Sequence, residues 1–81
     1  MKTIIKSKLF LRKGGFKNIF LWEIVSGGNV EYQLVEHLRN KTEKKQVLLG
    51  WYKKRIQAFS EFKRVMKREL KGLPYDRMAF D

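Results

Sequence analysis

Two pairs of glycines divide the first forty residues into three runs in which apolar and polar side chains alternate. Gly14-Gly15 separates residues 3–13 from residues 16–25, and Gly27-Gly28 precedes a third run at 30–39. Alternation with a period of two indicates β-strands with two different faces, and paired glycines supply the positive φ of tight turns. The chain is therefore expected to fold as an antiparallel meander.

A two-residue turn at Gly14-Gly15 fixes the register of the first hairpin, because directly opposed residues share a face of the sheet. This register pairs Leu9 with Phe20. The face expected to join the core carries Ile5, Leu9, Leu11, Phe16, Phe20, Trp22 and Ile24. The face expected to be basic and solvent-exposed carries Lys6, Lys8, Phe10, Arg12, Lys17, Ile19, Leu21 and Glu23. A slip of one residue would mix the two sets.

The length of the second loop decides which side of the third strand meets the core. A three-residue loop over 27–29 is preferred because it groups the apolar residues best, and it adds to the core face Val30, Tyr32, Leu34 and Leu38. Val35, His37 and Arg39 then join the basic face. A loop of two or four residues would reverse this assignment. After a polar loop at 40–45, residues 46–52 can form a short fourth strand.

The apolar period changes to three and four residues from about 53 to 71, which indicates an amphipathic helix. Its expected core positions are Ile56, Phe59, Phe62, Met66 and Leu70, with Ala58 and Val65 at the edge. Gly72 suits the end of a helix, and Pro74 prevents its continuation. The expected fold class is α+β, an antiparallel three- to four-stranded β-meander with one C-terminal amphipathic α-helix packed on one face. Residues 1–71 are expected to form a single compact domain, and 72–81 a short C-terminal tail.

The chain carries a net charge of +11, from 19 Lys and Arg against 8 Asp and Glu in 81 residues. Its hydrophobic content of 43% is enough to form a core, so this is not the composition of a disordered basic tail. A folded protein this basic generally binds a polyanion, most often nucleic acid. An acidic protein surface is the next candidate, and an acidic membrane surface is the least favoured.

The absence of cysteine excludes a disulfide framework and fits a cytoplasmic protein. No run approaches the roughly 18 apolar residues that span a bilayer. We do not expect the N-terminal residues to form a signal peptide, because Lys6 and Lys8 interrupt the apolar stretch. We therefore expect no membrane insertion.

Catalysis has little support in the sequence. The chain has a single histidine, its acids are scattered, and it contains neither a nucleophile motif nor a phosphate-loop motif. The usual catalytic combinations of residues are therefore missing from the sequence. The glycine pairs lie between expected strands rather than before a helix, so they are read as turns. We expect a protein that is not an enzyme and that has neither metal nor cofactor.

Two basic surfaces are candidate nucleic-acid contacts. On the hairpin, cations that could neutralise phosphates surround Phe10, on which a base could stack. The helix carries like charges four residues apart, and such pairs destabilise an isolated helix. A function that needs these cations, such as contact with phosphates, would explain why they are present. The candidate nucleic-acid-binding residues are Lys6, Lys8, Phe10, Arg12, Lys17, Arg39, Arg64, Lys67, Arg68 and Lys71.

Each surface also has a purely structural interpretation. The helix cations can be a solvated face that complements the negative end of the helix dipole. Phe10, Ile19, Leu21 and Val35 can form a second small core, or the interface of a homodimer with the lysines around its rim.

The sequence thus predicts a small non-enzymatic nucleic-acid-binding protein that neutralises phosphates. The alternative is a small interaction or regulatory protein, such as a phage- or plasmid-type inhibitor, that docks on an acidic protein surface. The choices between DNA and RNA, between single and double strands, and between monomer and homodimer stay open.

Overall fold

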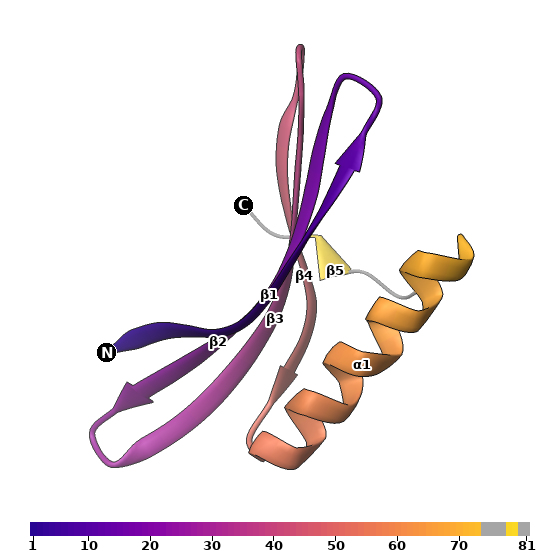
Figure 1. The fold of residues 1–81 in the computed structure, drawn as a ribbon. Helices are drawn as coiled ribbons and strands as arrows, with labels where there is room; N and C mark the ends of the chain where they lie inside the picture. Colours follow the sequence, from indigo (N-terminus) through magenta and orange to yellow (C-terminus); the bar gives the residue numbers. More distant parts are fainter. Residues whose placement is uncertain (74–77, 80–81) are drawn as a thin grey trace.

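The computed structural model describes residues 1–73 and 78–79. Four long strands run antiparallel in chain order and are followed by one helix (Figure 1). The elements are β1 (Lys2–Arg12), β2 (Gly15–Ser26), β3 (Asn29–Asn40), β4 (Lys44–Tyr52), α1 (Arg55–Lys71) and β5 (Met78–Ala79). The predicted fold class, an α+β meander with a C-terminal helix on one face, is confirmed. The short strand β5 pairs with β4 inside the segment expected to be a tail, of which residues 74–77 and 80–81 lie outside the described residues.

The first turn lies one residue earlier than predicted. Arg12 pairs with Gly15, so the turn consists of Lys13 and Gly14, and Gly14 supplies the positive φ of 78°. Gly15 instead begins β2, where a Cβ atom would overlap the backbone carbonyl oxygen of Arg39. Leu9 consequently lies opposite Asn18 rather than Phe20. From Lys6 onward each strand still shows the predicted sets of residues on its two faces, because this change of register preserves the side-chain alternation. An irregularity between Ile4 and Lys6 changes the faces before it, so Ile5 packs against the cluster of Ile19 and Leu21 rather than beside Leu9.

The second loop has two residues, so the preferred three-residue loop is wrong. Gly27 and Gly28 both have positive φ, 55° and 83°, and Ser26 pairs with Asn29. Two positive φ values in succession are what the tight hairpin turn favoured by strand twist requires. The shorter loop reverses the face of β3, which places Leu34 opposite Leu21.

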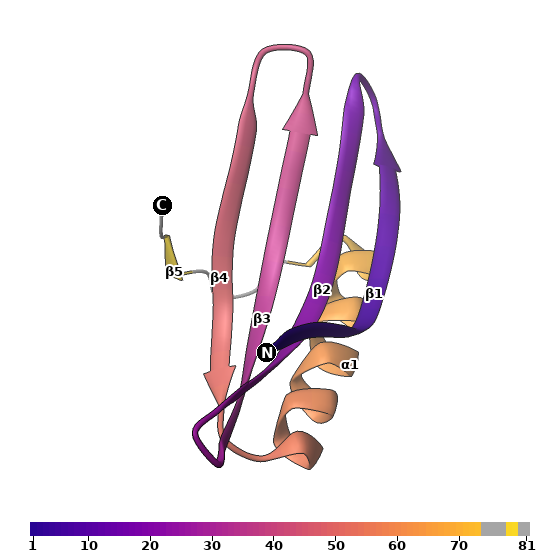
Figure 2. The same ribbon diagram turned by 90° about the vertical axis from the view of Figure 1, so that its left-hand side faces the viewer.

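The helix packs on the hairpin face that was predicted to be basic and exposed. Figures 1 and 2 show α1 along one side of the sheet and nothing of α1 on the other. The buried cluster on the helix side consists of Phe10, Ile19, Leu21, Tyr32, Leu34, Val47, Leu49, Ala58, Phe62 and Val65. We name this side the helix-covered face, and the side that α1 leaves uncovered the open face.

The core predicted for the hairpin was therefore assigned to the wrong face. Leu9 is 54% exposed, and Leu11 is exposed as well. Of the predicted core residues, Phe20 is buried, but it lies on the open face with Val35 opposite. The inversion arose because both faces of this hairpin carry large apolar residues. The helix covers the face to which β3 and β4 add their own apolar residues.

The helix begins two residues later than predicted, at Arg55, and ends as predicted. Gly72 has a φ of 70°, and its N–H donates to carbonyl oxygens of the last turn. The buried stripe is Ala58, Phe62 and Val65, which were expected at the centre or edge of the apolar face. Ile56 is 86% exposed, and Leu70 is exposed too, so both were wrongly assigned to the core.

Candidate nucleic-acid interface

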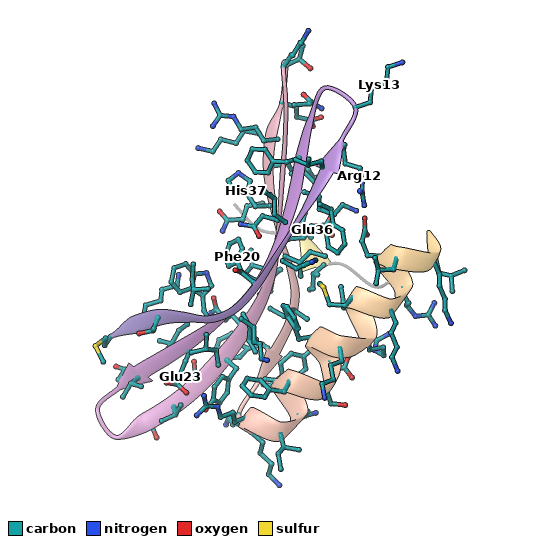
Figure 3. The ribbon with its side chains drawn as sticks, viewed as in Figure 1. Arg12, Lys13, Phe20, Glu23, Glu36 and His37 are labelled. Carbon is teal, nitrogen blue, oxygen red and sulfur yellow. The ribbon has the colours of Figure 1, made fainter. Side chains whose placement is uncertain are left out.

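Two hairpin cations predicted to contact phosphates bind the helix instead. The Lys17 ammonium lies 3.0 Å from Glu69 Oε2 and 3.6 Å from Glu36 Oε1, and the Arg12 guanidinium pairs with Glu69 Oε1. The Lys17 side chain is 12% exposed and that of Glu69 is 7% exposed. Figure 3 shows Arg12 on the side of the sheet that faces α1. These charges therefore join the hairpin to the C-terminal part of the helix.

Phe10 does not serve as a stacking platform for a base. It is 9% exposed and belongs to the core cluster, and the Arg12 guanidinium lies 5.4 Å from the centre of its ring. The exposed apolar surface proposed for a homodimer, with Ile19 and Leu21 beside Phe10, is likewise part of the core. These three residues form neither a second small core nor an exposed interface, because they belong to the main core under α1, while Val35 is buried on the open face.

The remaining predicted cations occupy separate surfaces. Lys6 and Lys8 are exposed on β1, and the Lys6 ammonium lies 5.2 Å from the centre of the Phe59 ring. On the helix, Lys67 and Lys71 are exposed, Arg68 is half-buried, and Arg64 pairs with Glu61 at 2.7 Å. Arg39 lies on the open face, because its partner across the ladder is Phe16. The structure thus does not bring the ten predicted residues together into one site.

Directly opposed residues share a face, so the open face carries four rows of side chains that cross β1 to β4 and a shorter row of Lys2, Ile24 and Glu31 beyond them. The row nearest the two-residue turn of the first hairpin contains Leu11, Phe16, Arg39 and Lys44. The next contains Leu9, Asn18, His37 and Gln46. The third contains Ser7, Phe20, Val35 and Leu48, and the fourth Ile4, Trp22, Gln33 and Trp51. Aromatic residues therefore lie at both ends of a face that also presents polar and cationic groups.

The aromatic residues of the open face differ in exposure. Trp51 is 55% exposed, whereas Phe16 and Trp22 are half-buried and Phe20 is buried. The Trp22 ring meets the Phe20 ring edge to face at 5.6 Å, and the Lys2 ammonium lies 4.6 Å from the centre of a Trp22 ring. Figure 3 shows Phe20 on the side of the sheet away from α1. A cation beside an accessible aromatic ring is a combination that single-stranded nucleic acid binds well.

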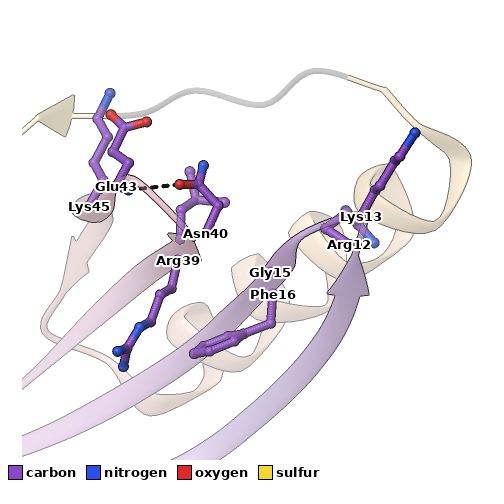
Figure 4. A pocket seen from close by; sticks show the side chains of 9 residues that line it. Arg12, Lys13, Gly15, Phe16, Arg39, Asn40, Glu43 and Lys45 are labelled. Atoms are coloured by element: carbon purple, nitrogen blue, oxygen red, sulfur yellow. Dashed lines mark hydrogen bonds between the residues drawn. The ribbon is translucent and has the colours of Figure 1, made fainter.

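The β1–β2 turn and the β3–β4 loop lie at the same end of the sheet (Figure 2). We name this end, residues 12–16 and 39–45, the hairpin tips. Its cations are Arg12, Lys13, Arg39, Lys41, Lys44 and Lys45, and Glu43 is its acid. Between the tips lies a cavity of about 150 Å³ lined by both hairpins, Arg39 and Lys45 included (Figure 4).

Most of the hairpin-tip cations were missed by the sequence interpretation. The sequence predicts Lys41, Lys44 and Lys45 in a polar loop and Lys13 in a strand, whereas β4 already begins at Lys44 and Lys13 belongs to the turn. The predicted topology could have identified them, because in a meander every second turn lies at the same end of the sheet. The first turn and the loop at 40–45 are therefore expected side by side. The sequence alone does not assign Trp51 to a face, and it predicts Trp22 and Phe16 in the core.

Two tyrosines on the helix-covered face have raised pKa values. Burial raises the pKa of Tyr32, and the hydrogen bond that its hydroxyl donates to Glu23 Oε2 at 3.0 Å raises it further, together with the charge of Glu23, against the opposing charge of Arg55. Burial also raises the pKa of Tyr52, with the charge of Glu61 adding to the effect and that of Arg64 opposing it. Both residues therefore stay neutral to a higher pH than an exposed tyrosine does.

We expect these tyrosines to make the fold sensitive to alkaline pH. A folded-state pKa above the unfolded value contributes stability that is complete below the unfolded value of about 10 and is lost as the pH rises through the folded value. Thermal unfolding followed between pH 8 and 12 should show a smaller alkaline decrease in Tm for Tyr32→Phe than for the parent chain. Equal decreases in the two proteins would assign the loss to other groups.

Within the described residues, no group of three or more histidine or acidic side chains is placed to hold a metal ion. No helix in the described part of the chain has the length and hydrophobicity needed to cross a bilayer. Comparison with known proteins finds no matching protein family, no matching curated protein and no matching solved structure.

Proposed function

We propose that this protein binds nucleic acid without catalysing a reaction, and that it does so through the open face and the hairpin tips. The observation that carries the proposal is the presence of accessible aromatic rings and cations on a sheet face that α1 leaves uncovered, in a chain of net charge +11. Base stacking and phosphate neutralisation are the two main contributions to the binding of single strands.

The proposal moves the interface from the surface predicted from the sequence. Phe10 is replaced as the stacking residue by Trp51, with Trp22 in the same row and Phe16 at the opposite end of the open face. Arg12 and Lys17 are largely engaged by Glu69, so the phosphate contacts pass to Arg39 and its cationic neighbours in the hairpin tips. The basic face of the helix is a separate surface on the other side of the sheet. Variants on the helix therefore serve as controls for variants on the open face.

Titration of fluorescently labelled oligonucleotides, single- and double-stranded, at several salt concentrations tests the proposal. If roughly five cations contact phosphates, the logarithm of the affinity should fall with the logarithm of the salt concentration at a slope near −3 to −5. The intrinsic fluorescence of the two tryptophans should change on binding. Trp51→Leu should weaken single-strand binding by roughly 1–3 kcal/mol and leave the slope unchanged, because stacking releases no counterions.

A matched control is Leu70→Ala, which alters an exposed apolar residue on the helix and should leave the affinity unchanged. Equal losses for Leu70→Ala and Trp51→Leu would contradict binding through the open face. No affinity for any oligonucleotide at low salt would contradict nucleic-acid binding altogether.

The alternative of an acidic protein partner has one specific observation in its favour. Leu9 and Leu11 are exposed on the open face near the hairpin tips, and an apolar patch beside cations also suits a protein interface. A partner of this kind predicts no binding to random oligonucleotides. A homodimer through the same face predicts a doubled mass in light scattering that Leu11→Asp reverses.

A further inference from the structure

We infer that the hairpin tips form a phosphodiester-binding site that receives the backbone of a single strand, with a base stacked on Phe16. This inference rests on the proposed function and specifies where the strand is held. It concerns residues 12–16 and 39–45, four of whose cations were not among the residues predicted from the sequence.

The first argument is an unfavourable pairing of like charges. Arg39 and Lys44 lie directly opposite each other on β3 and β4, and like charges in that arrangement destabilise a sheet. Lys41 follows Arg39 closely, and Lys45 follows Lys44. A charge arrangement that lowers stability without an evident structural gain is characteristic of functional sites. A bound anion removes the repulsion.

The second argument is the space between the tips. Gly15 approaches the backbone of Arg39 so closely that no side chain fits there, so the backbones of the two hairpins are in direct contact at this end of the sheet. Beside this contact lies the cavity of about 150 Å³, whose charged lining consists of Arg12, Lys13, Arg39 and Lys45 from both hairpins and one acid, Glu43. Figure 4 shows Arg39 and Phe16 extending to one side of the sheet and Lys45 to the other. An anion at this end of the sheet is therefore within reach of cations from both faces.

The third argument is that the β3–β4 loop is shaped in advance. Asn40 Oδ1 accepts hydrogen bonds from the N–H of Thr42 at 3.0 Å, from its hydroxyl at 3.2 Å and from the N–H of Glu43 at 2.7 Å. The Asn40 N–H donates to the Glu43 carbonyl oxygen at 2.9 Å. These bonds fix the loop that carries Lys41 before any ligand arrives, which lowers the entropic cost of binding.

Phe16 favours a single strand over a duplex or a free anion. It lies in the same row as Arg39 and Lys44, and its ring centre is 6.1 Å from that of His37. A half-buried ring beside phosphate-binding cations can stack on an unpaired base but not on a base inside a duplex. The row that follows contains Asn18 and Gln46, whose amides can hydrogen-bond to the edge of that base.

The experiment is an NMR titration of the ¹⁵N-labelled protein with a short oligothymidylate, combined with affinity measurements at several salt concentrations. The largest amide shifts are expected in residues 12–16 and 39–45. The double variant Arg39→Gln, Lys44→Gln should lower the magnitude of the salt slope by about 1.4, which is 0.7 for each phosphate contact of a single strand. Phe16→Leu should reduce the affinity roughly 5- to 150-fold without changing the slope. The matched control Lys67→Gln, Lys71→Gln on the helix should leave the slope unchanged.

Other results would overturn the inference in distinguishable ways. Shifts confined to α1, with a slope sensitive to the helix variant, would place the strand on the helix and leave nucleic-acid binding intact. Inorganic phosphate producing the same tip shifts, together with an unaltered affinity of Phe16→Leu for oligothymidylate, would show a site for free anions. No shift with any oligonucleotide would overturn both this inference and the proposed function.

Discussion

Lys17→Met is expected to destabilise the fold by about 3–5 kcal/mol, the range for breaking a buried ion pair from one side. The Lys17 ammonium contacts Glu36 and Glu69, two carboxylates that are almost completely buried. Methionine has a similar length but no charge, so the environment of both carboxylates loses a positive charge while the packing volume is kept. Small domains have total stabilities of about 5–15 kcal/mol, so much of the stability would be lost. Urea denaturation followed by tryptophan fluorescence measures the change.

Lys8→Met is the matched control, because Lys8 is an exposed lysine on the same face of the same hairpin. Its replacement should alter the free energy of unfolding by no more than about 0.5 kcal/mol. Adding Glu36→Gln to Lys17→Met should recover part of the loss, since the second change removes a buried charge. Equal stabilities for the two lysine variants would show that the ion pairs contribute nothing to the docking of the helix.

Phe62→Ala is expected to destabilise the protein by about 3–5 kcal/mol, as large-to-small changes of buried aromatic residues do. Phe62 is part of the core cluster, where it packs α1 against the sheet, and its truncation leaves a cavity in that cluster. Calorimetric or urea unfolding measures the loss. The same variant should expose the helix-covered face, so binding of a hydrophobic dye should increase.

Ile56→Ala provides the comparison on the same helix. Ile56 is 86% exposed, so its truncation should cost well below 1 kcal/mol. The apolar period of the sequence placed both residues on the core face, and only the structure separates them. Similar losses for the two variants would mean that the helix packs as its sequence period predicted rather than on the stripe from Ala58 to Val65.

The elements themselves could be predicted from local patterns. Alternation and glycine pairs predicted three consecutive strands, and the change of period predicted the helix with its end at Gly72. What the patterns could not provide was the face of the sheet on which the helix packs. The hairpin carries Phe10, Ile19 and Leu21 on one side and Phe20 and Trp22 on the other, so burial was decided by β3 and β4.

The candidate site was less predictable, for reasons of sequence distance. Lys17 and Glu69 are 52 residues apart, and nothing local distinguishes their ion pair from two solvated charges. The loop length at Gly27-Gly28 decided whether Val35 joined Phe10 or Phe20, and a difference of one residue reversed it. Arg39 was predicted as a contact and keeps that role in the proposal, but its cross-strand neighbour Lys44 could be recognised only from the register.

The position of β1 as the terminal strand of the sheet has a consequence for self-association. A terminal strand presents a row of backbone donors and acceptors to which a second chain can add, and such edges promote aggregation unless they are protected. Lys2, Lys6, Lys8 and Arg12 all project from this strand, and an irregularity between Ile4 and Lys6 interrupts its register. Edge-to-edge stacking of two chains would bring these cations together, so their repulsion opposes fibre formation. Reagents that neutralise the lysines therefore remove a barrier against aggregation as well as altering the charge of the surface.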